Sequence, residues 1–332
     1  MDALSDALGA MQLSGVIFLR GDFCGEYGVS MPSPNSFHPI VRPRSSEHRL
    51  VMFHIVQEGE GYVEVEGFAP QRIREGDLII VLDDLDHSLV DSPGRPTIDS
   101  TELVPVQTGV TLPPTATLGT GNRSIKIVCG MLQFVDRGYN PVFSALPPYL
   151  HISKNDGPSS PWLQQNVMHI IAEAGRERPG GAALLARLTE LLFVETVRGY
   201  LEMLPQSAGG WFAALKDPAV GKALETIHHA PADNWTVADL AKKAGVSRSA
   251  LSAQFAQMLG ISPIAYVTRW RIRLATNMLD DERLSVAQVA GQVGYDAEST
   301  FSRAFKREMG ASPTQWRNRS TSAGAEPDEH PP

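Results

Sequence analysis

One sequence pattern occurs twice in this chain, as TVADLAKKAGVS at residues 236–247 and as SVAQVAGQVGYD at residues 285–296. After one inserted residue the match continues through two apolar positions and a GxSP motif: Leu251 and Phe255 with Phe301 and Phe305, and GISP at 260–263 with GASP at 310–313. The offset between the copies is 49 residues before the insertion and 50 after it. Self-similarity at a fixed period predicts two copies of one supersecondary unit.

Each copy has the residues that a helix-turn-helix requires. Ala241 and Ala290 are small, which lets two helices cross closely. The glycine four residues later, Gly245 or Gly294, can adopt the positive φ of a tight turn. We therefore expect two helix-turn-helix units.

The second helix of each unit is expected over residues 247–259 and 296–309, with Ser247 and Asp296 as N-caps. An α-helix fits the major groove of B-form DNA, and the grooves on one face of the duplex recur about every 34 Å, so two linked units can read adjacent turns. A helix over residues 263–279 would set the spacing between the units, and it contains Arg269, Arg271 and Arg273. A helical repeat that binds protein is the alternative.

Positive charge is concentrated in the part of the chain that carries the repeat. Residues 1–214 carry 15 Lys and Arg against 24 Asp and Glu, whereas residues 215–319 carry 14 against 10. A basic segment in a chain of net charge −8 indicates a polyanionic partner.

The rest of the composition indicates a soluble cytoplasmic protein that does not enter a membrane. Cys24 and Cys129 are the only cysteines, too few for a disulfide framework or a four-thiolate zinc site, which favours a reducing compartment. Apolar runs are shorter than the ~18 to 20 residues of a membrane span. The N-terminus carries acidic residues where a signal peptide carries basic ones.

The first ~145 residues have the pattern of a β domain. Short apolar or alternating runs are separated by turn residues, and they read LVMFHIV at 50–56, YVEVE at 62–66, LIIVL at 78–82 and IKIVCGMLQF at 125–134. Such spacing predicts a sandwich or a barrel. The proline-rich stretch at 91–122 is expected to be a long irregular loop.

Two amphipathic helices follow. Apolar residues recur at three- and four-residue steps over 161–176 and 184–201, and RPGG at 178–181 separates the two runs. We expect an antiparallel helical hairpin, which either packs on the β domain or provides a dimer surface. Residues 205–210 are expected to be a linker.

Residues 211–318 resemble the DNA-binding domain of AraC/XylS-family transcriptional regulators, and the second copy carries the signature of that domain's second unit. The resemblance rests on Gly294-Tyr295, FSRAFK at 301–306, GASP at 310–313 and Trp316-Arg317. The N-terminal two-thirds is similar to the cupin-type sensor domain of one branch of that family, through Phe53-His54, Gly76-Asp77, His87 and the helices up to Leu201.

The resemblance implies an α+β multidomain fold. Its expected parts are a cupin-like β-barrel sensor domain over 1–148, a helical connector and possible dimerisation segment over 149–210, an all-α DNA-binding domain with two helix-turn-helix units over 211–319, and a disordered tail over 320–332. Such a chain is a sequence-specific DNA-binding transcription regulator that responds to a small-molecule effector, and it is not an enzyme. Its implied partners are double-stranded DNA, an effector, a second copy of the chain as a homodimer and, for an activator, RNA polymerase. Activator and repressor both stay open.

The family pattern, carried over by position, implies which side chains contact DNA. In the first unit they are Ser247, Arg248, Ser249, Ser252 and Ala253, and in the second Glu298, Ser299, Ser302 and Arg303, with Lys306 and Arg307 nearer the phosphates. Arg303 suits guanine and Glu298 suits cytosine, whereas serine makes no bidentate base contact. Two positions depart from the family pattern: Gln254, where a basic residue is frequent, and Ala297, where serine is usual.

The candidates for effector contacts are His54, Tyr62 and His87. Since His48 shares the strand parity of His54, and Asp83, Asp84 and Asp86 precede His87, these groups could also converge on a metal. The His-x-His pair followed by glutamate that metal-binding cupins carry is missing, so we expect no metal, no other cofactor and no catalytic residue. A metal-dependent cupin enzyme fused to a DNA-binding module is the alternative.

Overall fold

The computed structural model describes residues 2–11, 13–31, 48–82, 85–103, 113–121, 124–135, 139–153, 161–176, 178–205 and 208–323. Contacts divide the chain into two compact units. We call residues 12–135 with 146–203 the sheet unit, and residues 1–11, 136–145 and 204–332 the helical unit.

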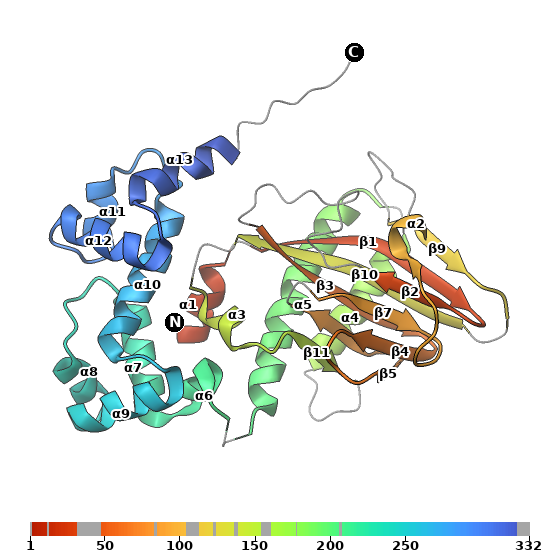
Figure 1. Ribbon diagram of the computed structural model, residues 1–332, viewed down its shortest axis with the longest axis horizontal. Helices are drawn as coiled ribbons and strands as arrows, with labels where there is room; N and C mark the ends of the chain where they lie inside the picture. The colour runs from red at the N-terminus through yellow and green to blue at the C-terminus, as the bar shows by residue number, and fades with distance from the viewer. Residues whose placement is uncertain are drawn as a thin grey trace, which may run out of the picture. The chain divides into compact units, whose positions relative to one another are not determined.

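The strands of the sheet unit form two sheets (Figure 1). The six-stranded sheet has the order β11-β6-β3-β10-β1-β9, with bounds Tyr149–Ile152, Leu78–Val81, His48–Glu58, Ser124–Val135, Leu13–Cys24 and Thr115–Leu118. The five-stranded sheet has the order β5-β4-β7-β2-β8, with bounds Gln71–Arg74, Glu60–Val65, His87–Val90, Gly28–Met31 and Ile98–Asp99. The expected cupin-like β domain is therefore present, as two separate sheets rather than one closed barrel.

The alternation of side chains along the strands explains why the sheets pack face to face. Inward residues of β4, Val63 and Val65, are buried, while the alternating residues Tyr62 and Glu64 are only half-buried. One core cluster takes side chains from both sheets, for example Met52 and Met131 from the first and Leu89 from the second. The core of this unit thus lies between the sheets.

Two helices complete the sheet unit, α4 (Pro161–Ala174) and α5 (Gly181–Met203). They pack on each other, with Asn166 Nδ2 donating to the Leu188 carbonyl at 2.9 Å, and α5 packs on β1 (Figure 1). The region expected to be an irregular loop differs from the prediction, because it contains β8, β9 and the short helix α2 (Ser100–Leu103). Backbone pairing explains this difference: β8 pairs with β2 and β9 with β1, both in parallel.

The helical unit contains the following helices: α1 (Ala3–Gly9), α3 (Pro141–Ala145), α6 (Gly210–Lys216), α7 (Pro218–His229), α8 (Val237–Ala244), α9 (Arg248–Leu259), α10 (Pro263–Met278), α11 (Val286–Gln292), α12 (Glu298–Met309) and α13 (Pro313–Ala323). The predicted helix between the repeats is α10, which stands between α8–α9 and α11–α12 (Figure 1). Helix α13 runs to Ala323, so the expected disordered tail begins as helix, and residues 324–332 lie outside the described part of the chain.

The division into units differs from the domain boundaries expected from the sequence. Helices α1 and α3 belong to the helical unit although they lie within residues 1–148, and α4 and α5 belong to the sheet unit rather than to a separate connector. Specific contacts with α10 explain the first difference. Arg273 and Asn277 both donate to the Ala10 carbonyl at 2.9 Å, and the Arg269 guanidinium lies 5.5 Å from the centre of the Tyr139 ring.

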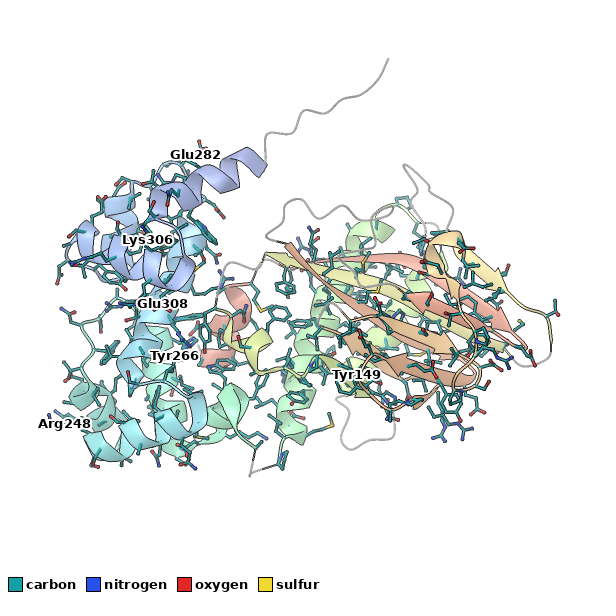
Figure 2. The ribbon with its side chains drawn as sticks, viewed as in Figure 1. Tyr149, Arg248, Tyr266, Glu282, Lys306 and Glu308 are labelled. Atoms are coloured by element: carbon teal, nitrogen blue, oxygen red, sulfur yellow. The ribbon has the colours of Figure 1, made fainter. Side chains whose placement is uncertain are left out.

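Each repeat has its own core. In the first, the buried Tyr266 hydroxyl of α10 accepts a hydrogen bond from Trp211 Nε1 and lies 2.8 Å from His228 Nε2 (Figure 2). In the second, Phe301 and Phe305 of α12 pack with Trp316 and with Ile272 of α10. Helix α10 therefore contributes to both cores.

Candidate functional site

The first helix-turn-helix unit consists of α8 and α9. A capping box starts α8, because Thr236 Oγ1 accepts from the Asp239 amide and the Asp239 carboxylate accepts from the Thr236 amide, both at 3.2 Å. Gly245 ends the helix at φ +73°, which confirms the predicted turn. Ser247 caps α9 by accepting from the Ala250 amide at 3.1 Å.

The second unit, α11 and α12, repeats this construction with one difference. Ser285 and Gln288 form a capping box on α11, and Gly294 has φ +86°. The expected N-cap of α12, Asp296, is wrong: the helix starts later, with Ala297 as N-cap in an extended conformation. Alanine has no side-chain acceptor, so no side-chain hydrogen bond caps α12.

The eleven side chains expected to meet DNA lie on the outer faces of these helices. The opposite faces of the same helices are fully buried, through Leu251 and Phe255 on α9 and Phe301 and Phe305 on α12. Ser252 and Ser302 are half-buried, and the others are exposed: Ser247, Arg248, Ser249, Ala253, Glu298, Ser299, Arg303, Lys306 and Arg307. The outer face of α9 thus presents one basic side chain, Arg248, and the outer face of α12 presents three.

The basic side chains on these faces differ in their contacts within the protein. Arg303 Nε donates to the Ser299 carbonyl of its own helix at 3.3 Å, and Arg307 Nε lies 3.2 Å from a Glu308 carboxylate oxygen. Within the described part of the chain, Arg248 and Lys306 form no ion pair. Both are labelled in Figure 2, where Arg248 projects from the outer end of the first unit. These side chains are available to an anionic partner.

Two of the three effector candidates meet in the core of the sheet unit. His54 on β3 and His87 on β7 are buried, with 2.7 Å between their Nε2 atoms. His54 Nδ1 lies 3.1 Å from Cys129 Sγ, and His87 Nδ1 lies 3.4 Å from the Leu85 carbonyl oxygen. Because a carbonyl only accepts, His87 Nδ1 carries its hydrogen; His54 Nε2 then donates to His87, and the Cys129 thiol donates to His54.

Burial keeps this chain of hydrogen bonds uncharged. It lowers the pKa of His87 to about 4 and the pKa of His54 well below its usual 6.5, and it raises the pKa of the Cys129 thiol. The neighbouring His87 also lowers the pKa of His54. All three groups are therefore neutral at pH 7.

The third candidate, Tyr62, does not join the two histidines. It lines a cavity of about 600 Å³ together with Tyr27 and Arg72. His87 borders a different cavity of about 380 Å³, where Glu64 and Asp99 contribute to the wall. The sheet unit therefore offers two cavities to a small molecule.

Of the candidate metal ligands, His54 lies between His87 and the Cys129 thiol. Both ring nitrogens of His54 are engaged, one with each neighbour, so the donors form a row and do not surround one point. Among the described residues no group of three His, Cys, Asp or Glu side chains is placed to hold a metal ion. Asp83, Asp84 and the His48 side chain lie outside the described residues.

Within the described part, no helix has the length and apolarity to span a membrane.

Known proteins are similar to this chain along most of its length. A family model described as Cupin matches residues 2–202, and one described as Helix-turn-helix domain matches residues 240–319. A Streptomyces lividans protein named as an AraC-like transcription regulator is 35% identical over 279 residues, which are 82% of this chain and 88% of the relative. The HTH-type transcriptional regulator AlkR of Acinetobacter baylyi is 27% identical over 322 residues, 96% of this chain and 100% of that one. Among solved structures, ToxT from Vibrio cholerae O395 is similar at 12% identity, with a TM-score of 0.35 over 94% of this chain and 98% of that chain.

Proposed function

The chain belongs to the AraC-like transcription regulators that carry a cupin domain, and on that premise we propose that its two helix-turn-helix units read two adjacent major grooves of one DNA duplex. One observation carries this proposal: α9 and α12 occupy equivalent places in a sequence repeat, and each buries two large apolar side chains while its outer face carries basic residues, Arg248 alone on α9 and three on α12. A single chain then makes the two contacts for which simpler repressors need a dimer.

The second unit is proposed to supply most of the base discrimination. Arg303 has the fork of donors that guanine O6 and N7 accept, and Glu298 can accept from cytosine N4. In the first unit only Arg248 offers comparable chemistry, because Ser249, Ser252 and Ala253 are too short for bidentate contacts. Lys306 and Arg307 are proposed to contact phosphates.

We infer that the sheet unit binds a small-molecule effector and that the activity is regulation rather than catalysis. Two cavities support the first inference, one bordered by His87 and the other by Tyr62. The second is supported by relatives that are named as transcription regulators and align with 82% or more of this chain. By linkage, an effector that changes the affinity for DNA binds the two states of the protein with different affinity. An activator would also contact RNA polymerase.

We also infer a homodimer through α4 and α5. These helices leave large apolar side chains exposed, with Trp162 at 70% and Met168 at 64% of their full exposure. Leu184 and Leu191 of α5 lie one heptad apart and are exposed as well, a spacing typical of helices that pair. Burial of this stripe against a second copy would remove it from water.

Enrichment of genomic DNA by the purified protein tests the proposal. The full-length chain is mixed at physiological salt with sheared DNA of its source genome, with and without a metabolite extract, and the retained fragments are sequenced. We expect sites with two short blocks about one helical turn apart. Retained sites with a single block, or no enrichment under either condition, would contradict the bipartite reading.

A further inference from the structure

The two turn glycines of the repeat have different surroundings. Both have positive φ, +73° at Gly245 and +86° at Gly294. A methyl group added at Gly245 would have no atom within 4 Å, whereas at Gly294 it would lie 2.7 Å from the Cα of Ala232. Ala232 belongs to the loop that leads into α8 of the first unit. The turn of the second unit therefore packs backbone to backbone on the first unit.

Arg271 of α10 bonds to both sides of this contact. Its Nε donates to the Pro231 carbonyl at 2.7 Å and its Nη2 to the Asp233 carbonyl at 2.8 Å, while its Nη1 donates to the Gly294 carbonyl at 2.9 Å. The guanidinium also lies 5.5 Å from the centre of the Tyr295 ring. One side chain thus connects the first unit, the second unit and the helix between them.

The chemistry of the guanidinium makes this connection stiff. Arg271 is only 9% exposed, and its planar fork directs three donors at carbonyl oxygens whose positions are fixed by the backbone. A lysine ammonium is a single point on a flexible stem and cannot reach three divergent acceptors in this way. The side chain of the neighbouring Arg269, by contrast, is 38% exposed and contacts Tyr139 and Glu308.

We propose that Arg271, residues 231–233 and Gly294 form a joint that fixes the relative position of α9 and α12, so that the protein selects its operators by the spacing between the two half-sites. Arg271 is in this account a positioning residue, which acts on specificity without touching DNA. The inference rests on the proposed function, since it presupposes that both helices read one duplex.

The first experiment measures tolerance to operator spacing. The full-length wild type selects a bipartite operator, and one base pair is then added between its halves, which moves one half by about 3.4 Å and rotates it by about 35°. We expect the wild type to lose about tenfold or more in affinity, comparable to a mismatched base pair. In Arg271→Lys and Gly294→Ala the same added base pair should lower the affinity about threefold or less, because the two units can change their relative position to meet both half-sites.

Gly245→Ala is the matched control. It places the same methyl group at the same kind of positive φ but away from the joint, so it should keep the wild-type penalty for the added base pair. Equal spacing penalties in wild type, Arg271→Lys and Gly294→Ala would overturn the joint. Failure of the wild type to select a bipartite operator is a separate result, which refutes the proposed function on which the joint depends.

A second experiment needs no DNA. Pulsed electron paramagnetic resonance measures the distance between α9 and α12 when spin labels are attached at Ser249→Cys and Ser299→Cys. The background carries Cys24→Ser and keeps the buried Cys129. We expect one narrow distance distribution in the wild type and in Gly245→Ala, and a broader one in Arg271→Lys and Gly294→Ala. The same width in all four proteins would overturn the joint, and if Gly294→Ala fails to fold, Arg271→Lys carries the comparison.

Discussion

Lowering the pH from 7 to 5 is expected to destabilise the sheet unit through its buried imidazoles. The unfolded chain takes up a proton on each histidine near pH 6.5, but burial lowers the pKa of His87 to about 4 in the folded protein. The unfolded state therefore binds more protons over this interval, and stability falls with pH. Integrating this difference in proton binding from pH 7 to pH 5 gives a loss of about 2 kcal/mol from His87 alone, and His54 adds to it in the same direction.

Hydrogen exchange followed by mass spectrometry measures this loss strand by strand. A loss of about 2 kcal/mol corresponds to opening of β3 and β10 that is about thirtyfold more frequent at pH 5 than at pH 7, after correction for the intrinsic exchange rate. His87→Gln should reduce the pH effect, because one titrating group is removed. His169→Gln, at an exposed position on α4, is the control and should behave as the wild type. Equal protection at both pH values, or an unchanged pH effect in His87→Gln, would refute the reasoning.

Three further predictions concern the DNA-binding helices. Arg303→Ala should reduce the preference for an operator that carries the contacted guanine over one with another base there by about 5- to 150-fold, while nonspecific binding is retained. Competition with mutated operators measures this preference, and equal preference in mutant and wild type would show that Arg303 does not contact the base. Lys306→Ala should weaken binding to all sequences and lower the slope of log affinity against log salt by about one, and an unchanged slope would place Lys306 away from the phosphates. Ser247→Ala should cost about 1 kcal/mol in thermal or urea unfolding because α9 loses its cap, whereas Ala297→Ser should stabilise α12 by a similar amount or less, and the opposite signs would contradict the assigned caps.

Local patterns in the sequence predict much of the helical unit. The turn glycines, the N-cap of α9 and the buried pair on each of α9 and α12 all follow from neighbours within about five residues. The start of α12 does not, because Asp296 is a better cap than Ala297 by residue type and the backbone conformation decides between them. The burial of Arg271 cannot be predicted from local sequence either, since its carbonyl partners lie 23 to 40 residues away in the chain.

The sheet unit is less predictable because its contacts depend on strand pairing. The sequence marks His54 and His87 as candidates but does not place them together, since β3 and β7 belong to different sheets. Cys129 joins them only because β10 pairs with β3, with Cys129 opposite His54. Residue type alone suggests Tyr62 as a partner of these histidines, but it lines a separate cavity. Likewise, no local pattern indicates that α1 and α3 belong with α10.

Hydroxyl-radical footprinting of the full-length protein on an operator from the genomic selection tests the central claim most directly. Two helices in adjacent major grooves should protect two blocks whose centres lie about 10 base pairs apart, on one face of the duplex. Arg248→Ala should weaken protection of one block and Arg303→Ala protection of the other. A single protected block, or loss of the same block in both variants, would contradict the claim that each unit reads its own groove.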